Sequence, residues 1–325
     1  MAVNAAKRSS DSYREVRAAA GSFLKLCYTP ELAAEVTLQP LRRYDLDASI
    51  VFADILVVPH AMGCDLDFLE GEGPRLSVVN GVEATGALKP VAETWQVARV
   101  CDTVRQVRQS LDQHVALIGF CGAPWTVASY MIEGSGTAER LNARRAAMEQ
   151  PQWFRDVMAM LVVDSIDYLC AQVAAGADAV QIFESWGGDV PWPLQQSLIY
   201  APMRAIRDGV RARCGDVPVI AFVRGAGQGH VTAAAAIDAN AIGLEQGVDM
   251  AWAAREVPCA IQGNLDPVAL AVGGDALDSA IDRIVAAVPR QKHIFNLGHG
   301  IRQETSPLNV ERMVARVRQQ DGLAG

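Results

Sequence analysis

Short apolar runs alternate with longer stretches of helical periodicity along most of the chain. Runs with few polar residues are typical of strands that are buried on both faces of a parallel sheet. A longer helical pattern follows each run, which indicates repeated βα units. We expect seven such strands, at 50–56, 115–120, 177–183, 217–222, 241–244, 260–262 and 294–297.

The segments between these strands carry helix signals. An apolar stripe of four valines at 97, 100, 104 and 107, continued by Leu111, predicts one helix that ends just before the second strand. Helix starts are expected where a hydroxyl residue precedes a proline, since the hydroxyl can cap the helix and the proline suits its first turn. These starts are Thr29-Pro30 and Ser306-Pro307, and Pro151 is a third candidate.

Seven parallel strands are one fewer than a closed α/β barrel requires. The deficit falls at the N-terminus, because the run of Ser and Asp at 9–12 favours turns over strands. We therefore predict an α/β fold, a parallel (β/α)8 TIM-type barrel that lacks or alters its first strand. Residues 1–12 form an atypical N-terminal segment and 13–325 a single barrel domain. The alternative is an open doubly wound sheet, but no Gly-rich dinucleotide fingerprint follows any of the strands.

Charge and cysteine content narrow the class of partner. Lys and Arg total 29 against 37 Asp and Glu, a formal charge of −8, which disfavours nucleic acid and anionic membranes and favours a small molecule. The seven cysteines are an odd number without paired spacing, as expected for reduced thiols in the cytoplasm. No export signal or apolar run of membrane-spanning length is evident in the sequence.

Four of the predicted strand ends carry side chains that could act on a ligand, because barrel sites form after the carboxyl ends of the strands. Asp54 interrupts an apolar run and needs a partner if it is buried. Tyr130 follows the Gly-Ala-Pro turn at 122–124, Ser185 precedes two glycines, and His299 lies between Gly298 and Gly300. Taken singly, each has a structural reading as well: a satisfied core Asp, a packing Tyr, a capping Ser or a structural His.

A metal site is not predicted. His60 and Cys64 have a spacing that could begin a zinc site, but no second cluster of Cys and His completes it.

Several stretches in the same order resemble the uroporphyrinogen decarboxylase family, from about Tyr13 to the last helix. They are Tyr-Arg-Glu-Val-Arg at 13–17, Thr-Leu-Gln-Pro-Leu-Arg-Arg at 37–43, the Asp54 run through Pro59, Gly-Ala-Pro-Trp-Thr at 122–126, Gln-Gly-Asn-Leu-Asp-Pro at 262–267 and Asn-Leu-Gly-His-Gly at 296–300.

This resemblance implies decarboxylation of the four acetate side chains of uroporphyrinogen III, giving coproporphyrinogen III, with no metal or organic cofactor and usually in a homodimer. It implies that Asp54 lies under the macrocycle and accepts hydrogen bonds from the pyrrole N–H groups. Tyr130, Ser185 and His299 match residues that contact the substrate or its carboxylates, and Arg17 matches a basic residue of the same site. Asp54 and Tyr130 are the expected catalytic residues.

The N-terminal segment departs from the family pattern. Family members have Arg-Gln-Ala-Gly-Arg-Tyr-Leu-Pro-Glu-Tyr where this chain has residues 4–13, which places Arg8 in register with the second arginine and Asn4 with the first. Each charge-assisted hydrogen bond to a carboxylate contributes roughly 1.5 to 3 kcal/mol, so the loss of an arginine matters for an anionic substrate. Glu245 also stands where a shorter aspartate is usual.

Two other functions remain open at this point. The first is a catalytically impaired relative that binds porphyrinogen or a partner without turnover. The second is a corrinoid-linked methyltransferase on the same barrel, which requires a zinc site of thiolate and histidine that the sequence does not show.

Overall fold

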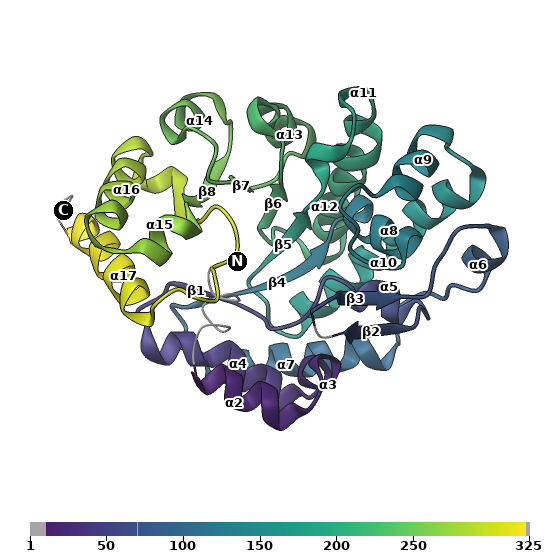
Figure 1. The fold of residues 1–325 in the computed structure, drawn as a ribbon, viewed down its shortest axis with the longest axis horizontal. Coiled ribbons are helices and arrows are strands. Elements are labelled where there is room, and N and C mark those ends of the chain that lie inside the picture. The colour runs from purple at the N-terminus through teal and green to yellow at the C-terminus, as the bar shows by residue number, and fades with distance from the viewer. Residues whose placement is uncertain (1–10, 70, 323–325) are drawn as a thin grey trace.

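The computed structural model describes residues 11–69 and 71–322, so Arg8 and Asn4 lie outside the described residues. Its main sheet has seven parallel strands in the order β1-β4-β5-β6-β7-β8-β9, curled with helices on its outer side (Figure 1). The predicted parallel barrel and its seven strands are confirmed. The strands are β1 (Ala48–Ile50), β4 (Ala116–Gly122), β5 (Ala179–Glu184), β6 (Val219–Val223), β7 (Ala241–Gly243), β8 (Ala260–Leu265) and β9 (His293–Leu297).

The first strand differs from its prediction. The apolar run suggested a strand at 50–56, but β1 ends at Ile50. Val51 extends the pairing with β4 by one hydrogen bond, donating its N–H to the carbonyl of Ile118, 3.0 Å away. Val51 and Phe52 are nonetheless buried, which explains why apolar content alone extended the predicted strand too far. Asp54 therefore lies in the connection after β1 and not inside a strand.

The first strand was expected to be lacking or altered in the segment before residue 13, and residues 1–10 of that segment lie outside the described residues. Within the described ranges, β1 pairs only with β4 and β9 only with β8. A cavity of about 630 Å³ opens in this region and reaches Ile118, Gln181 and Gln262 on the inner strands. Helix α17 (Pro307–Gly322) lies nearby, where Arg318 donates to Asp47 at 2.7 Å.

The remaining helices follow the expected βα alternation. Thr29 is the N-cap of α4, although its hydroxyl donates to the carbonyl of Lys25 and does not cap α4. Ser306 and Pro151 also precede helix starts, as predicted. The α-helices besides α17 are α2 (Asp11–Ala20), α3 (Phe23–Tyr28), α4 (Pro30–Arg43), α5 (Val57–Ala61), α6 (Val82–Gly86), α7 (Trp95–Ser110), α8 (Pro124–Glu133), α9 (Leu141–Glu149), α10 (Gln152–Ala174), α11 (Trp192–Gln195), α12 (Ala201–Cys214), α13 (His230–Ile237), α14 (Met250–Glu256), α15 (Pro267–Val272) and α16 (Gly274–Ala287).

The predicted valine stripe forms the inner face of α7. Val100, Val104 and Val107 are completely buried, while Leu111 is the C-cap residue and only partly buried. The stripe therefore buries one face of α7 in the main core, where the helix packs mainly against α4, α5 and α10.

Helix α10 is, in the described chain, the one helix that is long and apolar enough to span a bilayer by length and composition alone. Phe154, Leu161 and Leu169 on this helix are almost fully buried in the main core, as is typical of the core helix of an α/β protein.

Two elements near the N-terminus were not predicted from the sequence. An antiparallel hairpin of β2 (Leu66–Leu69) and β3 (Gly73–Leu76) lies outside the main sheet. Helix α2 packs separately from the main core, with the ring centroid of Tyr13 6.2 Å from that of Phe52. This contact ties α2 to the connection that carries Asp54.

Candidate active site

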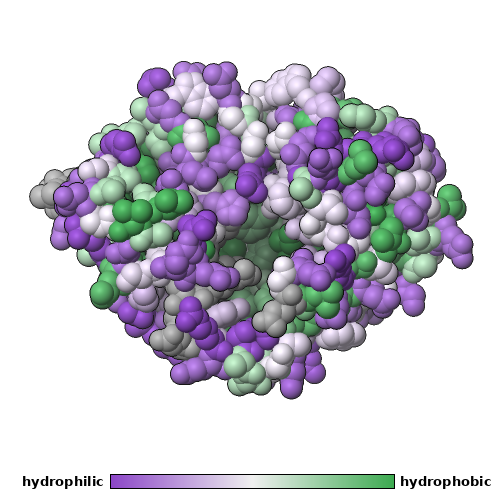
Figure 2. All heavy atoms as spheres, viewed as in Figure 1, coloured by the Kyte–Doolittle hydropathy of each residue, from purple (hydrophilic) through white to green (hydrophobic). Residues whose placement is uncertain are grey.

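The predicted site residues on the loops lie at one edge of the sheet. Asp54 follows β1, Ser185 follows β5 and His299 follows β9, and all three strands are parallel, so their carboxyl ends lie at the same edge. Tyr130 is on α8, the helix that follows β4. The space-filling view has a hollow near its centre, with apolar residues inside and hydrophilic residues around it (Figure 2).

The charge of Asp54 affects the pKa of Tyr130. Oδ1 of Asp54 accepts the N–H of Leu56 at 2.8 Å, which fixes the carboxylate in the turn before α5. Burial raises the pKa of the Tyr130 phenol, and the negative charge of Asp54 raises it further. Tyr130 therefore keeps its proton at neutral pH and is available as a hydrogen-bond donor.

Ser185 is positioned by a buried carboxyl group. Glu184, the last residue of β5, is completely buried and accepts the hydroxyl of Thr126 at 2.5 Å and the N–H of Trp186 at 2.9 Å. The N–H of Ser185 donates in turn to Oγ1 of Thr126 at 2.8 Å. Burial raises the pKa of Glu184 to about 7, against the lowering effect of its hydrogen bonds. This network locks the β5 loop to α8, which carries Tyr130.

Trp186 joins the Tyr130 side of the site to two arginines. Its ring centroid lies 6.4 Å from that of Tyr130. The guanidinium of Arg140 lies 4.0 Å from the Trp186 ring and that of Arg224 5.8 Å from it, within the range of cation–π attraction. Arg140 is buried and also pairs with Asp189, whereas Arg224, directly after β6, is exposed.

His299, after β9, is half-buried. Burial lowers the pKa of its imidazole, the charge of Arg224 lowers it further, and the charge of Glu245 acts in the opposite direction. Glu245, Arg224 and Trp186 follow three consecutive strands of the sheet, β7, β6 and β5. The structure thereby connects His299 with the Tyr130 side of the site through Arg224 and Trp186, which the sequence did not single out, and through Glu245, which it marked only as a departure from the family pattern.

Arg17 is partly buried on α2. The structure places this helix against Phe52 through Tyr13, so Arg17 belongs to the segment next to the Asp54 connection. The other predicted basic residue, Arg8, lies outside the described residues.

His60 has a structural setting. Its Nδ1 lies 2.9 Å from the hydroxyl of Tyr28 and its ring packs against Trp95. Over 11–69 and 71–322, no group of three or more His, Cys, Asp or Glu side chains could hold a metal ion.

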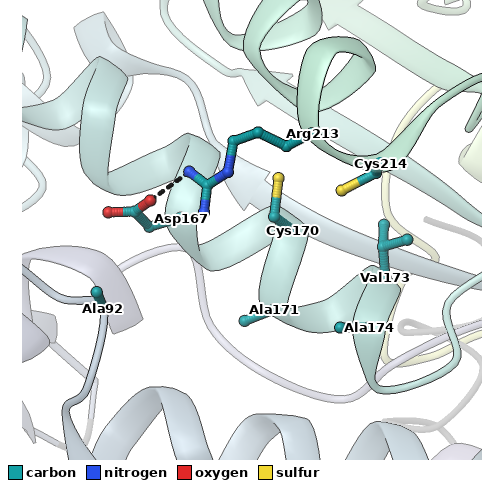
Figure 3. Close-up of a pocket in the computed structure, with 8 residues that line it drawn as sticks. All are labelled: Ala92, Asp167, Cys170, Ala171, Val173, Ala174, Arg213 and Cys214. Carbon is teal, nitrogen blue, oxygen red and sulfur yellow. Dashed lines mark hydrogen bonds and ion pairs between the residues drawn. The ribbon is translucent and has the colours of Figure 1, made fainter.

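A second cavity, of about 520 Å³, lies away from the strand ends, between α10 and α12. The thiols of Cys170 and Cys214 point toward one another there, beside the ion pair of Arg213 with Asp167 (Figure 3). It shares no residue with the groups around Asp54 and His299.

Sequence reasoning missed Glu184, Arg140 and Arg224. Glu184 directly follows the predicted strand at 177–183 and Arg224 lies two residues after the one at 217–222, which was an available signal. Arg140 carries no such signal, because it reaches Trp186 from the connection between α8 and α9.

Comparison with known proteins identifies the family. The family model described as uroporphyrinogen decarboxylase (URO-D) matches residues 2–320. A protein of Paracoccus denitrificans named uroporphyrinogen decarboxylase is 47% identical over 317 residues, which cover 96% of this chain and 92% of that protein. One of the same name from Sinorhizobium fredii is 46% identical over 314 residues, covering 96% and 91%.

A solved structure, a methyltransferase from Methanosarcina mazei, is similar in fold, with a TM-score of 0.79 at 18% identity, covering 96% of this chain and 91% of that one. At this level of identity it supports the barrel fold alone. The family model and the relatives extend over nearly the whole chain, and the chain belongs to the uroporphyrinogen decarboxylase family.

Proposed function

We propose that this protein decarboxylates the four acetate side chains of uroporphyrinogen III to give coproporphyrinogen III, in the biosynthesis of heme and related porphyrins. The observation that carries the proposal is the fixed carboxylate of Asp54 at the same strand-end edge of the barrel as Ser185 and His299, in a chain about 45% identical to proteins named for this activity. In this proposal, 13–325 form the single catalytic domain.

The chemistry requires an electron sink without a cofactor. A pyrrole that is protonated on carbon becomes a cation, and loss of CO2 returns the electrons of the broken bond to that ring and leaves an exocyclic methylene. Protonation of the methylene carbon gives the methyl group, and the ring carbon releases its proton. A fixed carboxylate under the ring stabilises the cation electrostatically. Asp54, held by the N–H of Leu56, takes this role, and the protonated phenol of Tyr130 orients the reacting acetate.

Substrate carboxylates need cationic or donor groups around the rim. In the proposal, His299, Ser185, Arg17 and Arg8 bind these carboxylates. Arg224 supports this role, because it is exposed beside Trp186 and acts electrostatically on His299. A guanidinium can bind a carboxylate with two parallel hydrogen bonds.

The proposal also includes the location, oligomeric state, cofactors and partners that the family resemblance implies. A cytoplasmic homodimer without metal or organic cofactor is expected, with no nucleic-acid or membrane partner. The charge of −8 supports the last point, since anionic surfaces would be repelled.

The decisive experiment incubates the purified 325-residue chain with uroporphyrinogen III under anaerobic, reducing conditions and separates the products by carboxylate number. Products with seven to four carboxylates are expected, with Asp54→Ala as the inactive control. Equilibrium binding of uroporphyrinogen is measured in parallel. Binding without any seven-carboxylate product would refute catalysis and favour the impaired relative, and absence of binding would refute both.

A further inference from the structure

Hydrogen bonds hold the backbone of Arg224, the first residue after β6, on both sides. Its N–H donates to the carbonyl of Glu184, and its own carbonyl accepts the N–H of Gly188, each at 2.9 Å. The next amide, that of Gly225, donates to Oε2 of Glu245 at 2.7 Å. The end of β5, the loop after it and the loop after β7 thus fix the point from which the Arg224 side chain extends.

The loops after β5 and β6 also pack backbone against backbone. A Cβ added to Gly188 would lie 2.9 Å from the Cα of Gly225, and a Cβ added to Gly225 would lie 2.7 Å from the Cα of Gly188. Both distances are shorter than van der Waals contact, so the close approach requires glycine at both positions. The loop that begins with Arg224 is therefore held in place by packing as well as by hydrogen bonds.

The two arginines beside Trp186 differ in the use of their charge. Arg140 lies 4.0 Å from the indole ring, is buried and pairs with Asp189. Arg224 lies 5.8 Å from the same ring and is exposed. In the part of the chain that the structure describes, its guanidinium has no carboxylate partner. The charge of Arg140 is therefore neutralised within the fold, whereas that of Arg224 is available to an anionic ligand.

Arg224 lies at the same edge of the sheet as the predicted site. Strands β5 and β6 are parallel neighbours, so Ser185 and Arg224, which follow them, extend from the same edge. Trp186 lies between Arg224 and the ring of Tyr130 in the chain of ring contacts, 6.4 Å from the latter. The charge of Arg224 also acts on His299, whose pKa it helps to lower, in agreement with this position.

We propose that Arg224 is a further substrate-binding residue, whose guanidinium pairs with one peripheral carboxylate of the porphyrinogen at the strand-end edge of the barrel. This inference rests on the proposed function, which supplies the ligand. An exposed guanidinium without an internal partner can form two parallel hydrogen bonds with a carboxylate. Because the backbone of Arg224 is already fixed, binding has to order only its side chain, which limits the entropic cost.

The test compares the affinity of the full chain and its variants for uroporphyrinogen III under anaerobic, reducing conditions. If the chain turns over, the affinity is followed through KM with kcat measured separately; if it does not, the ligand is not consumed and Kd is measured directly. Arg224→Gln is expected to raise KM or Kd by about tenfold or more, as for the loss of one charge-assisted hydrogen bond, with a smaller change in kcat. Arg224→Lys keeps the charge without the planar fork and should weaken binding less.

Arg255→Gln is the matched control. It removes the same charge from an exposed position in the last turn of α14, which leads into the amino end of β8 and so lies at the opposite edge of the sheet. Its affinity for uroporphyrinogen should equal that of the wild type. Added salt should weaken binding less in Arg224→Gln than in the wild type, because a screened charge pair is missing from the variant.

The product shows which carboxylate is bound. Coproporphyrinogen III lacks the acetates and is not consumed, so its Kd is measured with the same variants. Equal weakening of both ligands in Arg224→Gln would assign the pair to a carboxylate that the product retains, and weakening of uroporphyrinogen alone would assign it to an acetate.

An unchanged affinity for uroporphyrinogen in Arg224→Gln would overturn the inference and leave the proposed function standing. Equal losses in Arg224→Gln and Arg224→Lys, with a salt dependence like that of the wild type, would indicate a structural role beside Trp186 and would also overturn it. If the wild-type chain neither binds nor converts uroporphyrinogen, the proposed function fails, and the assignment of Arg224 fails with it.

Discussion

The carboxylate of Asp54 lies close enough to Tyr130 to raise the pKa of its phenol, although the two residues come from different βα units. Asp54 follows β1 and Tyr130 is on the helix after β4. These strands are neighbours in the sheet, with Ile50 opposite Ile118. The pairing of β1 with β4 thus brings a fixed anion and a neutral hydroxyl donor to the same edge.

Replacing Asp54 should remove activity while the protein stays folded. Asp54→Ala is expected to abolish turnover, and Asp54→Asn, which keeps the size and loses the charge, should lower kcat by roughly 100-fold or more, as for other electrostatic stabilisers of a transition state. Single-turnover decarboxylation is the measurement, with circular dichroism to confirm folding. Wild-type kcat in Asp54→Asn would contradict an electrostatic role.

Tyr130→Phe should have a milder effect. The variant keeps the ring that packs on Trp186 and loses only the hydroxyl, so a decrease of about tenfold in kcat/KM is expected, in line with one neutral hydrogen bond. The ratio of kcat/KM between variant and wild type tests this. Losses of equal, small size in Tyr130→Phe and Asp54→Asn would mean that the two roles are wrongly assigned.

Glu184 should make stability depend on pH. Its pKa is about 7 in the folded protein and about 4.3 in an unfolded chain, so between these values the folded state binds more protons. The contribution of this group is therefore fully present below about pH 4.3 and is lost as pH rises through 7, by on the order of 3 kcal/mol.

Urea unfolding at several pH values measures this effect. Glu184→Gln should be less stable at low pH, because the N–H donors of Thr126 and Trp186 bond to different carboxyl oxygens and the amide NH2 faces one of them in either orientation, and it should lack this part of the pH dependence. A variant whose unfolding free energy runs parallel to that of the wild type from pH 4.5 to 7 would show that Glu184 does not titrate there.

Gly298→Ala should disturb the corner that carries His299. The added methyl would lie 2.3 Å from the backbone nitrogen of Gln246, and such a contact is relieved only by moving the loop, at a cost of about 1–3 kcal/mol. Thermal unfolding and KM should both change. Gly247→Ala is the matched control, because a methyl there meets no atom within 4 Å, and equal effects in the two variants would contradict the prediction.

Cys121 should be inert to alkylation in the folded protein. Burial raises the pKa of its thiol to about 12, so almost no thiolate is present at pH 8. Mass spectrometry after iodoacetamide treatment should find Cys121 unmodified and the partly exposed Cys214 modified. After unfolding, both should react, and rapid labelling of native Cys121 would argue against its burial.

The strand pattern could be predicted because a parallel sheet buries both faces of its strands, which leaves apolar runs such as 217–222 that need no tertiary information. The same rule failed for β1. Val51 and Phe52 are buried outside the sheet. A buried connection has the same apolar composition as a buried strand, so composition alone could not tell them apart.

The sequence by itself determined the βα order and the positions of Asp54, Ser185 and His299 after strands, since these follow from local periodicity and chain order. Only the tertiary structure decided which charged and aromatic side chains surround these three residues. Arg140 reaches Trp186, and His230 reaches Glu245, across elements that no spacing in the chain relates. The curvature of the sheet brings these side chains together, and that curvature depends on the packing of the whole barrel.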